Sequence, residues 1–156
     1  MARSFRFQPR YRGIALTAIG VGGGLGVVAV ATLGAALLPL ATGAVGVVLG
    51  AGYLLSPSWK LAVVVDDDGL EVRGPRRPRF RIAWGDVVRV IAAPSSQTCF
   101  VDGGAPERSL LVPGVGAPAP YDLEDKRALY DAILAHVDPA KVERVASLEA
   151  ARKAKA

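Results

Sequence analysis

Hydrophobic and polar positions follow three patterns along the chain. From Ile14 to Trp59 no residue is charged. From Leu61 to Val112 apolar residues recur mostly at every second position, which is the period of a strand with one buried face. After Asp122 they recur three or four residues apart, as in an amphipathic helix. The patterns predict an apolar segment, then a sheet, then closing helices.

The uncharged stretch is long enough for two membrane spans, because one spanning helix needs about 20 apolar residues. Leu38-Pro39-Leu40 interrupts it, and proline cannot continue a helix in the ordinary way. We therefore expect a transmembrane hairpin over 14–57, with helices at about 14–38 and 41–57. Two alternatives stay open. One is a cleaved signal peptide, although its apolar core is only about 7–15 residues long; the other is a single long, tilted or re-entrant helix.

The charges predict how the hairpin is oriented. Four of the 19 basic residues lie in the first twelve positions, and no acidic residue precedes Asp66. Because basic segments stay in the cytoplasm, residues 1–13 are expected to be a basic cytoplasmic tail, and two crossings return the chain to the same side. The prediction is a multi-pass protein of the cell (inner) membrane with both termini in the cytoplasm. A single cysteine, Cys99, fits that reducing compartment.

Charge also bears on the class of partner. From Ser58 onward the 15 remaining basic residues (19 − 4) are nearly balanced by 14 acidic ones. A nucleic-acid-binding domain carries a basic footprint of its own, so no nucleic acid is expected as a partner.

Glycines with GxxxG spacing recur in the apolar stretch, as the pairs Gly20/Gly24, Gly22/Gly26 and Gly46/Gly50. In lipid, small residues let helix backbones approach closely. The favoured interpretation is that the two helices pack on each other. The alternative is homo-oligomerisation, or docking on another membrane protein, through these glycine-rich helices.

The region of alternating residues predicts a domain over 58–137. Six short strands are separated by glycine and proline turns, at about 61–65, 70–73, 79–84, 87–92, 98–102 and 109–112. This spacing is typical of an antiparallel sandwich or barrel. A helix should then run from Asp122, its N-cap, to about Val137, with Asp125 as a capping-box acid. Residues 138–156 should form a second helix, beginning at Asp138-Pro139, as a C-terminal extension.

The run Asp66-Asp67-Asp68-Gly69 is a candidate metal site or a turn. A calcium loop needs acidic residues at alternate positions and a later glutamate, which this run lacks. Asp-Gly between alternating strands is a strong hairpin signal, because glycine readily adopts positive φ. We therefore predict a turn and expect no metal site or cofactor.

Four stretches resemble the bacterial PH-like domain membrane proteins of the YcxB-like group. They are "LAVVVDDDGLEVRG", "RFRIAWGDVVRV", "SLLVPG" and "YDLEDKRALYDAIL". The resemblance implies a two-helix membrane anchor and a cytoplasmic α+β domain, a PH-like antiparallel β-barrel or sandwich closed by a C-terminal helix. PH domains that capture phosphoinositides use basic residues around the first hairpin loop. This sequence has three aspartates there, which argues against capture at that loop.

The candidate binding site is the stretch "RGPRRPRFR", between the second and third predicted strands. It contains Arg73, Arg76, Arg77, Arg79 and Arg81. Three interpretations remain open. The arginines contact anionic lipid headgroups, bind an acidic protein partner, or form a solvated charged edge that resists aggregation.

No catalytic residues are expected. Cys99 reads as a small core residue without a neighbouring base, His136 has no companion ligands, and Trp84 should lie in the core. We therefore expect a non-enzymatic, membrane-anchored binding or scaffolding module. Its partners would be the lipid bilayer and an unidentified membrane or cytoplasmic protein. The alternative is sensing of anionic lipid or of the membrane surface through residues 73–81.

Overall fold

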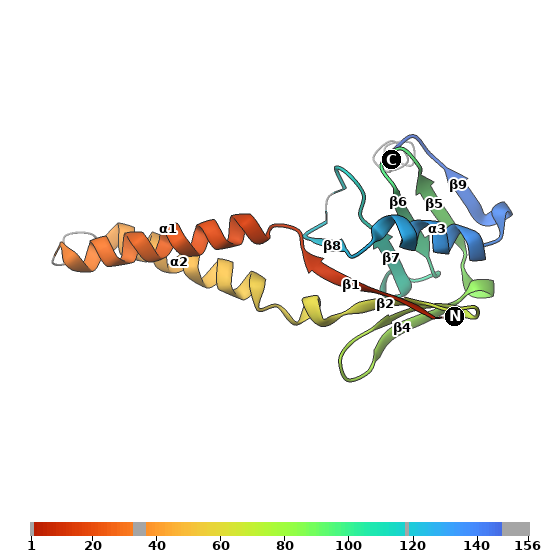
Figure 1. The fold of residues 1–156 in the computed structure, drawn as a ribbon, viewed down its shortest axis with the longest axis horizontal. Helices are drawn as coiled ribbons and strands as arrows, with labels where there is room; N and C mark the ends of the chain where they lie inside the picture. The colour runs from red at the N-terminus through yellow and green to blue at the C-terminus, as the bar shows by residue number, and fades with distance from the viewer. Residues whose placement is uncertain (1, 33–36, 118, 148–156) are drawn as a thin grey trace. The chain divides into compact units, whose positions relative to one another are not determined.

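The structure is a computed structural model that describes residues 2–32, 37–117 and 119–147 (Figure 1). It divides into two compact units. Residues 9–59 form a helical unit, and residues 1–8 together with 60–156 form a β unit. The helical unit is therefore inserted in the sequence of the β unit.

The helical unit contains α1 (Arg12–Ala31) and α2 (Leu37–Leu54), followed by a 3-10 turn over Pro57–Lys60. The expected boundaries, 14–38 and 41–57, differ from these at all four ends. Pro39, which we expected to separate the helices, lies in the first turn of α2. Proline is tolerated there, because N–H groups of the first turn have no partner within the helix.

The two helices pack through glycine. Gly22, Gly43 and Gly50 are buried. A Cβ atom added to Gly22 would lie 2.5 Å from the Gly43 carbonyl oxygen, and one added to Gly50 would lie 2.7 Å from that of Ala15. Any side chain there would force the backbones apart. This confirms that the helices pack on each other through glycine.

The first sheet of the β unit has the order β4-β3-β2-β1-β8. Its strands are β1 (Arg3–Pro9), β2 (Ala62–Val65), β3 (Gly69–Arg73), β4 (Pro78–Ala83) and β8 (Tyr121–Leu123). Neighbours among β1 to β4 pair antiparallel.

β1 lies where the sequence predicted a basic tail over residues 1–13. Phe5 and Phe7 alternate with polar residues, and both rings are buried. Phe5 pairs with Val63 of β2. Burial of two aromatic rings on one face therefore turns this segment into a strand within the sheet.

The second sheet has the order β7-β6-β5-β9. Its strands are β7 (Ser109–Val112), β6 (Thr98–Asp102), β5 (Arg89–Ala93) and β9 (Val142–Arg144). Strands β2 to β7 confirm the six predicted strands. The sheets are separate and do not form the closed barrel that the family resemblance implied.

The end of the described chain differs from the expected second helix over 138–156. Asp138 does cap a turn, since its side chain accepts a hydrogen bond from the Ala140 N–H. That 3-10 turn, Pro139–Lys141, leads into β9, which pairs parallel with β5. β9 thereby satisfies the open edge of β5. Residues 148–156 of the expected helix lie outside the described part of the chain.

Helix α3 (Lys126–His136) follows β8. Asp125, and not Asp122, is its N-cap and accepts a hydrogen bond from the Ala128 N–H. Asp122 and Leu123, expected at the start of this helix, belong to β8 instead. The side chains of Leu129 and Ile133 are fully buried, and α3 contacts β2 of the first sheet and β7 of the second. The β unit is thus a mostly antiparallel two-sheet fold with a C-terminal helix.

Candidate functional site

The acidic turn between β2 and β3 is held by its own first aspartate. Asp66 Oδ1 accepts hydrogen bonds from the backbone N–H groups of Asp68 (3.0 Å) and Gly69 (2.8 Å). The Asp66 N–H donates to the Gly69 carbonyl at 3.0 Å. This confirms the predicted turn.

The reason for glycine at position 69 differs from the one we expected. Among the described glycines, only Gly104 and Gly116 have positive φ. At Gly69 a Cβ atom would instead collide with the Ile82 carbonyl of β4. The close approach of the neighbouring strand therefore requires glycine here.

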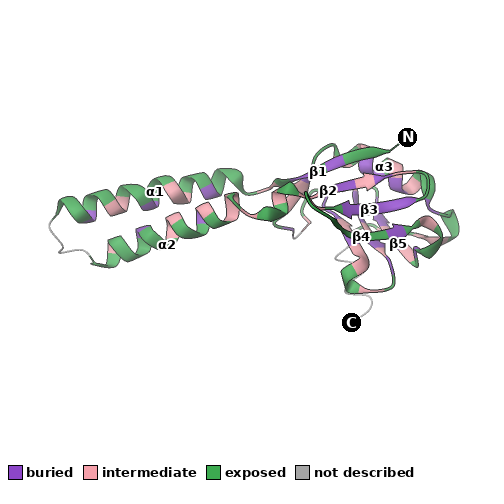
Figure 2. Cartoon of the chain, turned by 90° about the horizontal axis from the view of Figure 1, so that it is seen from below, coloured by how far each residue is buried: buried purple, intermediate pink, exposed green. Residues whose placement is uncertain are grey.

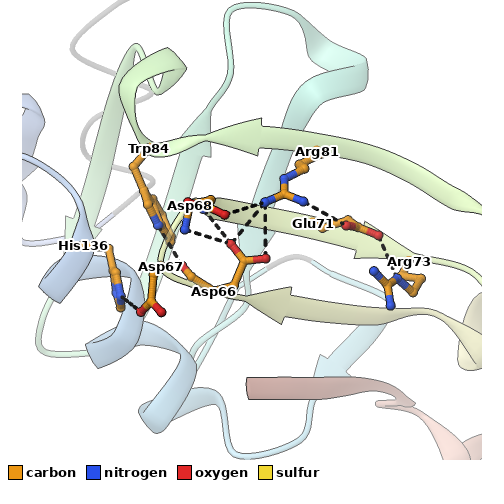
Figure 3. Close-up of polar contacts among 9 residues, drawn as sticks. Asp66, Asp67, Asp68, Glu71, Arg73, Arg81, Trp84 and His136 are labelled. Atoms are coloured by element: carbon orange, nitrogen blue, oxygen red, sulfur yellow. Dashed lines mark hydrogen bonds and ion pairs between the residues drawn. The ribbon is translucent and has the colours of Figure 1, made fainter. Parts of the chain in front are cut away.

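A guanidinium group lies against the carboxylates of this turn. Arg81 Nη2 is 3.3 Å from Asp66 Oδ1 and 3.7 Å from Asp68 Oδ2 (Figure 3). Within the described residues, no three His, Cys, Asp or Glu side chains are placed to hold a metal ion. The arginine thus compensates the acidic charge of the turn.

Glu71 extends this network along β3. Its side chain is only 7% exposed, and its carboxylate lies 2.8 Å from Arg73 Nε and 3.9 Å from Arg81 Nη1. The register pairs Glu71 directly with Arg81 across β3 and β4. A buried carboxylate needs such partners. The hydrogen bond that Arg73 donates to Glu71 also raises the pKa of the Arg73 guanidinium.

The structure therefore separates the five predicted site arginines into two groups. Arg73 and Arg81 are paired with carboxylates. Arg76, Arg77 and Arg79 are exposed, and within the described chain none of their side chains forms an ion pair or hydrogen bond. We call these three arginines the arginine loop, because Arg76 and Arg77 lie in the connection between β3 and β4 and Arg79 is the second residue of β4. A hydrogen bond of 3.0 Å from the Gly74 N–H to the Arg77 carbonyl closes the loop.

The arginine loop lies at one particular end of the first sheet. Ala62, the first residue of β2, pairs with both Arg73 and Arg6. A Cβ added to Gly74 would lie 3.6 Å from the Leu61 side chain. The loop thus shares the sheet end where β1 finishes and β2 begins, and the acidic turn lies at the opposite end of β3.

His136 contacts the acidic turn from α3. Its ring stacks on Trp84 with centroids 5.2 Å apart, and its Nε2 lies 3.8 Å from Asp67 Oδ1. The Trp84 indole N–H donates to the Asp66 carbonyl at 2.9 Å. Trp84 is half-buried in a 3-10 turn, Trp84–Asp86, and is not the core residue that we expected. These contacts fasten α3 to the turn.

Cys99 is fully buried, as predicted for a core residue. Burial raises the pKa of its thiol to about 12. The thiol therefore stays neutral at physiological pH, whereas a nucleophilic cysteine must ionise.

Sequence reasoning missed Glu71 and the contacts of His136. Glu71 alternates with the apolar residues Leu70 and Val72. Its spacing of two from Arg73 was the available signal, because i and i+2 share a face in a strand.

The chain was compared with family models, curated proteins and solved structures, and no match was found in any of the three.

Proposed function

We propose that this protein is a membrane-anchored, non-catalytic binding module. In this proposal α1 and α2 cross the cell membrane, and a PH-like β unit lies at its cytoplasmic face. The observation that carries the proposal is the pairing of β1 with β2, the two strands that flank the helical unit in sequence.

The β1–β2 pairing constrains how the chain meets a membrane. The Phe7 N–H donates to the Leu61 carbonyl at 3.1 Å, so the chain must return to the side that it left. Two crossings satisfy this condition. A single spanning helix would separate Phe7 from Leu61, and cleavage of a signal peptide would remove β1 from the sheet. The pairing therefore supports the hairpin over a cleaved signal peptide and over a single spanning helix. A re-entrant segment would also satisfy the pairing, but two helices of 20 and 18 residues favour the hairpin over it.

The surface of the helices supports insertion. The segments Arg12–Ala31 and Leu37–Lys60 are long and apolar enough to span, and only 17% and 11% of their most apolar windows are buried. A core helix of a soluble protein would be mostly buried. Among the described residues, the exposed large apolar side chains lie almost entirely in the helical unit, with Val88 and Val115 as the exceptions. Such a surface is stable in lipid.

The basic residues beside the helices support a cytoplasmic β unit. Arg10 and Arg12 precede or begin α1, and Lys60 follows α2. Lys and Arg close to spans favour the cytoplasmic side. The PH-like assignment rests on the antiparallel strands followed by α3, together with the sequence stretches quoted above.

A thiol-accessibility experiment on intact cells and inverted vesicles tests the proposal. Cysteines are introduced singly at Ser4, at Leu38 and at Glu107 and are labelled with a membrane-impermeant maleimide. The buried native Cys99 should contribute little background. We expect Ser4→Cys and Glu107→Cys to react only in inverted vesicles, and Leu38→Cys only from outside. Labelling of all three from one side would contradict two crossings.

The second candidate function is sensing of anionic lipid through residues 73–81. The unpaired arginines at the sheet end where the chain enters the helices favour it over an acidic protein partner.

A further inference from the structure

We infer that Arg76, Arg77 and Arg79 bind anionic headgroups of the same bilayer that the two helices cross. This inference rests on the proposed function and names the ligand of the binding module. It concerns the arginine loop alone, because Arg73 and Arg81 already face carboxylates.

The first argument is the uncompensated charge. Arg89 and Arg108, which are half-buried, face acidic residues, Asp102 at 3.2 Å and Asp86 at 3.7 Å, whereas the three arginines of the loop face none among the described residues. No acidic residue occurs in the sequence between Glu71 and Asp86. A solvated edge strand needs only scattered charges of either sign to resist aggregation. Three arginines without an acid form a surface suited to anions.

The second argument is position. The loop lies at the sheet end where β1 ends at Pro9 and β2 begins at Ala62. From that end, β1 leads within a few residues into α1. The Pro57–Lys60 turn, which follows α2, leads almost directly into β2 at the same end. Two covalent connections therefore tether this end of the β unit beside the point where the chain enters the bilayer. Exposed Lys60 adds a further cation there.

The third argument is preorganisation. Pro78 directly follows Arg77, and proline fixes φ. The Gly74–Arg77 hydrogen bond closes the same turn. A loop that is already ordered loses little conformational entropy when it binds.

Tethering also selects the bilayer over a protein. A tethered surface meets its ligand at a high effective concentration, whereas an acidic protein would have to reach the loop by diffusion. Basic residues near an anionic membrane surface each strengthen binding by about fivefold, and the attraction falls with salt.

The experiment uses the full-length protein in nanodiscs of phosphatidylcholine, alone or with phosphatidylglycerol at a 7:3 ratio. A Pro75→Cys variant carries an environment-sensitive fluorophore on the loop, and spin-labelled lipid serves as quencher. We expect stronger quenching in the anionic nanodiscs than in the neutral ones at low salt. High salt should abolish the difference.

Two matched variants identify the residues. Arg76→Ser/Arg77→Ser should weaken loop contact by about fivefold for each arginine removed. Arg127→Ser/Arg144→Ser removes the same charge from exposed residues of α3 and β9 and should leave quenching unchanged. Circular dichroism of both variants checks that the fold persists.

A second fluorophore separates the two proposals. Placed on Val48→Cys, exposed on α2, it should be quenched by lipid in every nanodisc. If this label is quenched while the loop label ignores lipid charge and the arginine substitutions, the inference about the loop is wrong and the anchor stands. If the Val48→Cys label is not quenched, the proposed function itself is wrong.

Discussion

The two units of this chain use the same aliphatic residues in opposite ways. In the β unit the large side chains, such as Leu70 and Ile82, are fully buried, and charged residues cover the outside. In the helical unit the buried residues are glycine and alanine, and valine and leucine point outward, as at Val48 and Leu49. Figure 2 shows buried residues concentrated on the strands and exposed ones along both helices.

The difference matches the surroundings that the proposed function assigns to each unit. Water drives large apolar groups inward. Lipid gives them no such drive, so helices associate by close van der Waals packing, which small residues permit. Composition alone does not distinguish the β unit from the helical unit. The two units differ in whether glycine or the larger aliphatic residues occupy the buried positions.

The strongest test of this division removes β1 from the β unit. A fragment of residues 58–156 lacks a strand that lies between β2 and β8, and we expect it not to fold. Joining residues 2–8 to residue 60 through a short glycine-rich linker restores the strand, and this variant should fold in water without lipid. Two-dimensional amide NMR spectra of the two proteins provide the measurement. A well-dispersed spectrum from 58–156 would contradict the role of β1.

Shortening an aliphatic side chain should affect the two units very differently. Leu70→Ala leaves a cavity in the β unit, and we expect a loss of about 2–5 kcal/mol in the free energy of unfolding. Val48→Ala removes methyl groups from an exposed helix surface, where surface substitutions stay within about 0.5 kcal/mol. Thermal unfolding of both variants in detergent, monitored by near-ultraviolet circular dichroism, measures the two losses of stability. Equal losses would remove the distinction drawn above.

Adding one methyl group at a helix contact should destabilise the helical unit, whereas removing methyl groups from its outer surface should not. Gly22→Ala places a Cβ 2.5 Å from the Gly43 carbonyl, and overpacking typically costs about 1–3 kcal/mol. Gly23→Ala is the matched control, because nothing lies within 4 Å of a Cβ there. Titration with sodium dodecyl sulfate should unfold the Gly22→Ala helices earlier. Indistinguishable midpoints would show that the glycine contact does not set the helix packing.

The last effect concerns the buried thiol of the β unit and arises only at alkaline pH. The pKa of Cys99 is about 12 in the folded chain, against an ordinary value of 9.0. The folded state therefore holds its proton more tightly than the unfolded state, and stability falls as pH rises from 9 toward 12. The slope from this one group approaches about 1.4 kcal/mol per pH unit.

Cys99→Ala isolates this contribution, because the tyrosines that also titrate at alkaline pH are present in both proteins. We expect the stability of wild type relative to Cys99→Ala to decline above pH 9 and to stay constant below it. Urea unfolding at several pH values measures the difference. A constant difference across the range would contradict ionisation of a buried thiol on unfolding.

The parts of the fold that sequence predicted are those with a long, local pattern. Strands β2 to β7 each carry a readable alternation, and α3 has an amphipathic stripe. β1 was missed although Phe5 and Phe7 alternate with polar residues, because its arginines suggested a tail. β8 and β9 have only three residues each, and their pairing depends on partners distant in sequence.

The candidate site shows the same limit. Sequence identified the five arginines but could not tell that Arg81 is paired, because that pairing depends on the register of β3 against β4. The pairing of Arg73 with Glu71, two residues away in the same strand, did have a local signal. The stacking of His136 on Trp84 likewise required the placement of α3. A pairing between residues far apart in sequence has no local signal.

The insertion of the helices between β1 and β2 has a consequence for biosynthesis. A ribosome adds about 5–20 residues per second, so β1 leaves the exit tunnel seconds before its partner strand. The helices then shorten the gap, since the Tyr11 N–H donates to the Tyr53 hydroxyl at 3.0 Å across their ends. Each halving of the loop to be closed lowers its entropic cost by about 0.6 kcal/mol. Membrane insertion would therefore act as a folding step for the β unit, because it brings the two strands to the same place before they pair.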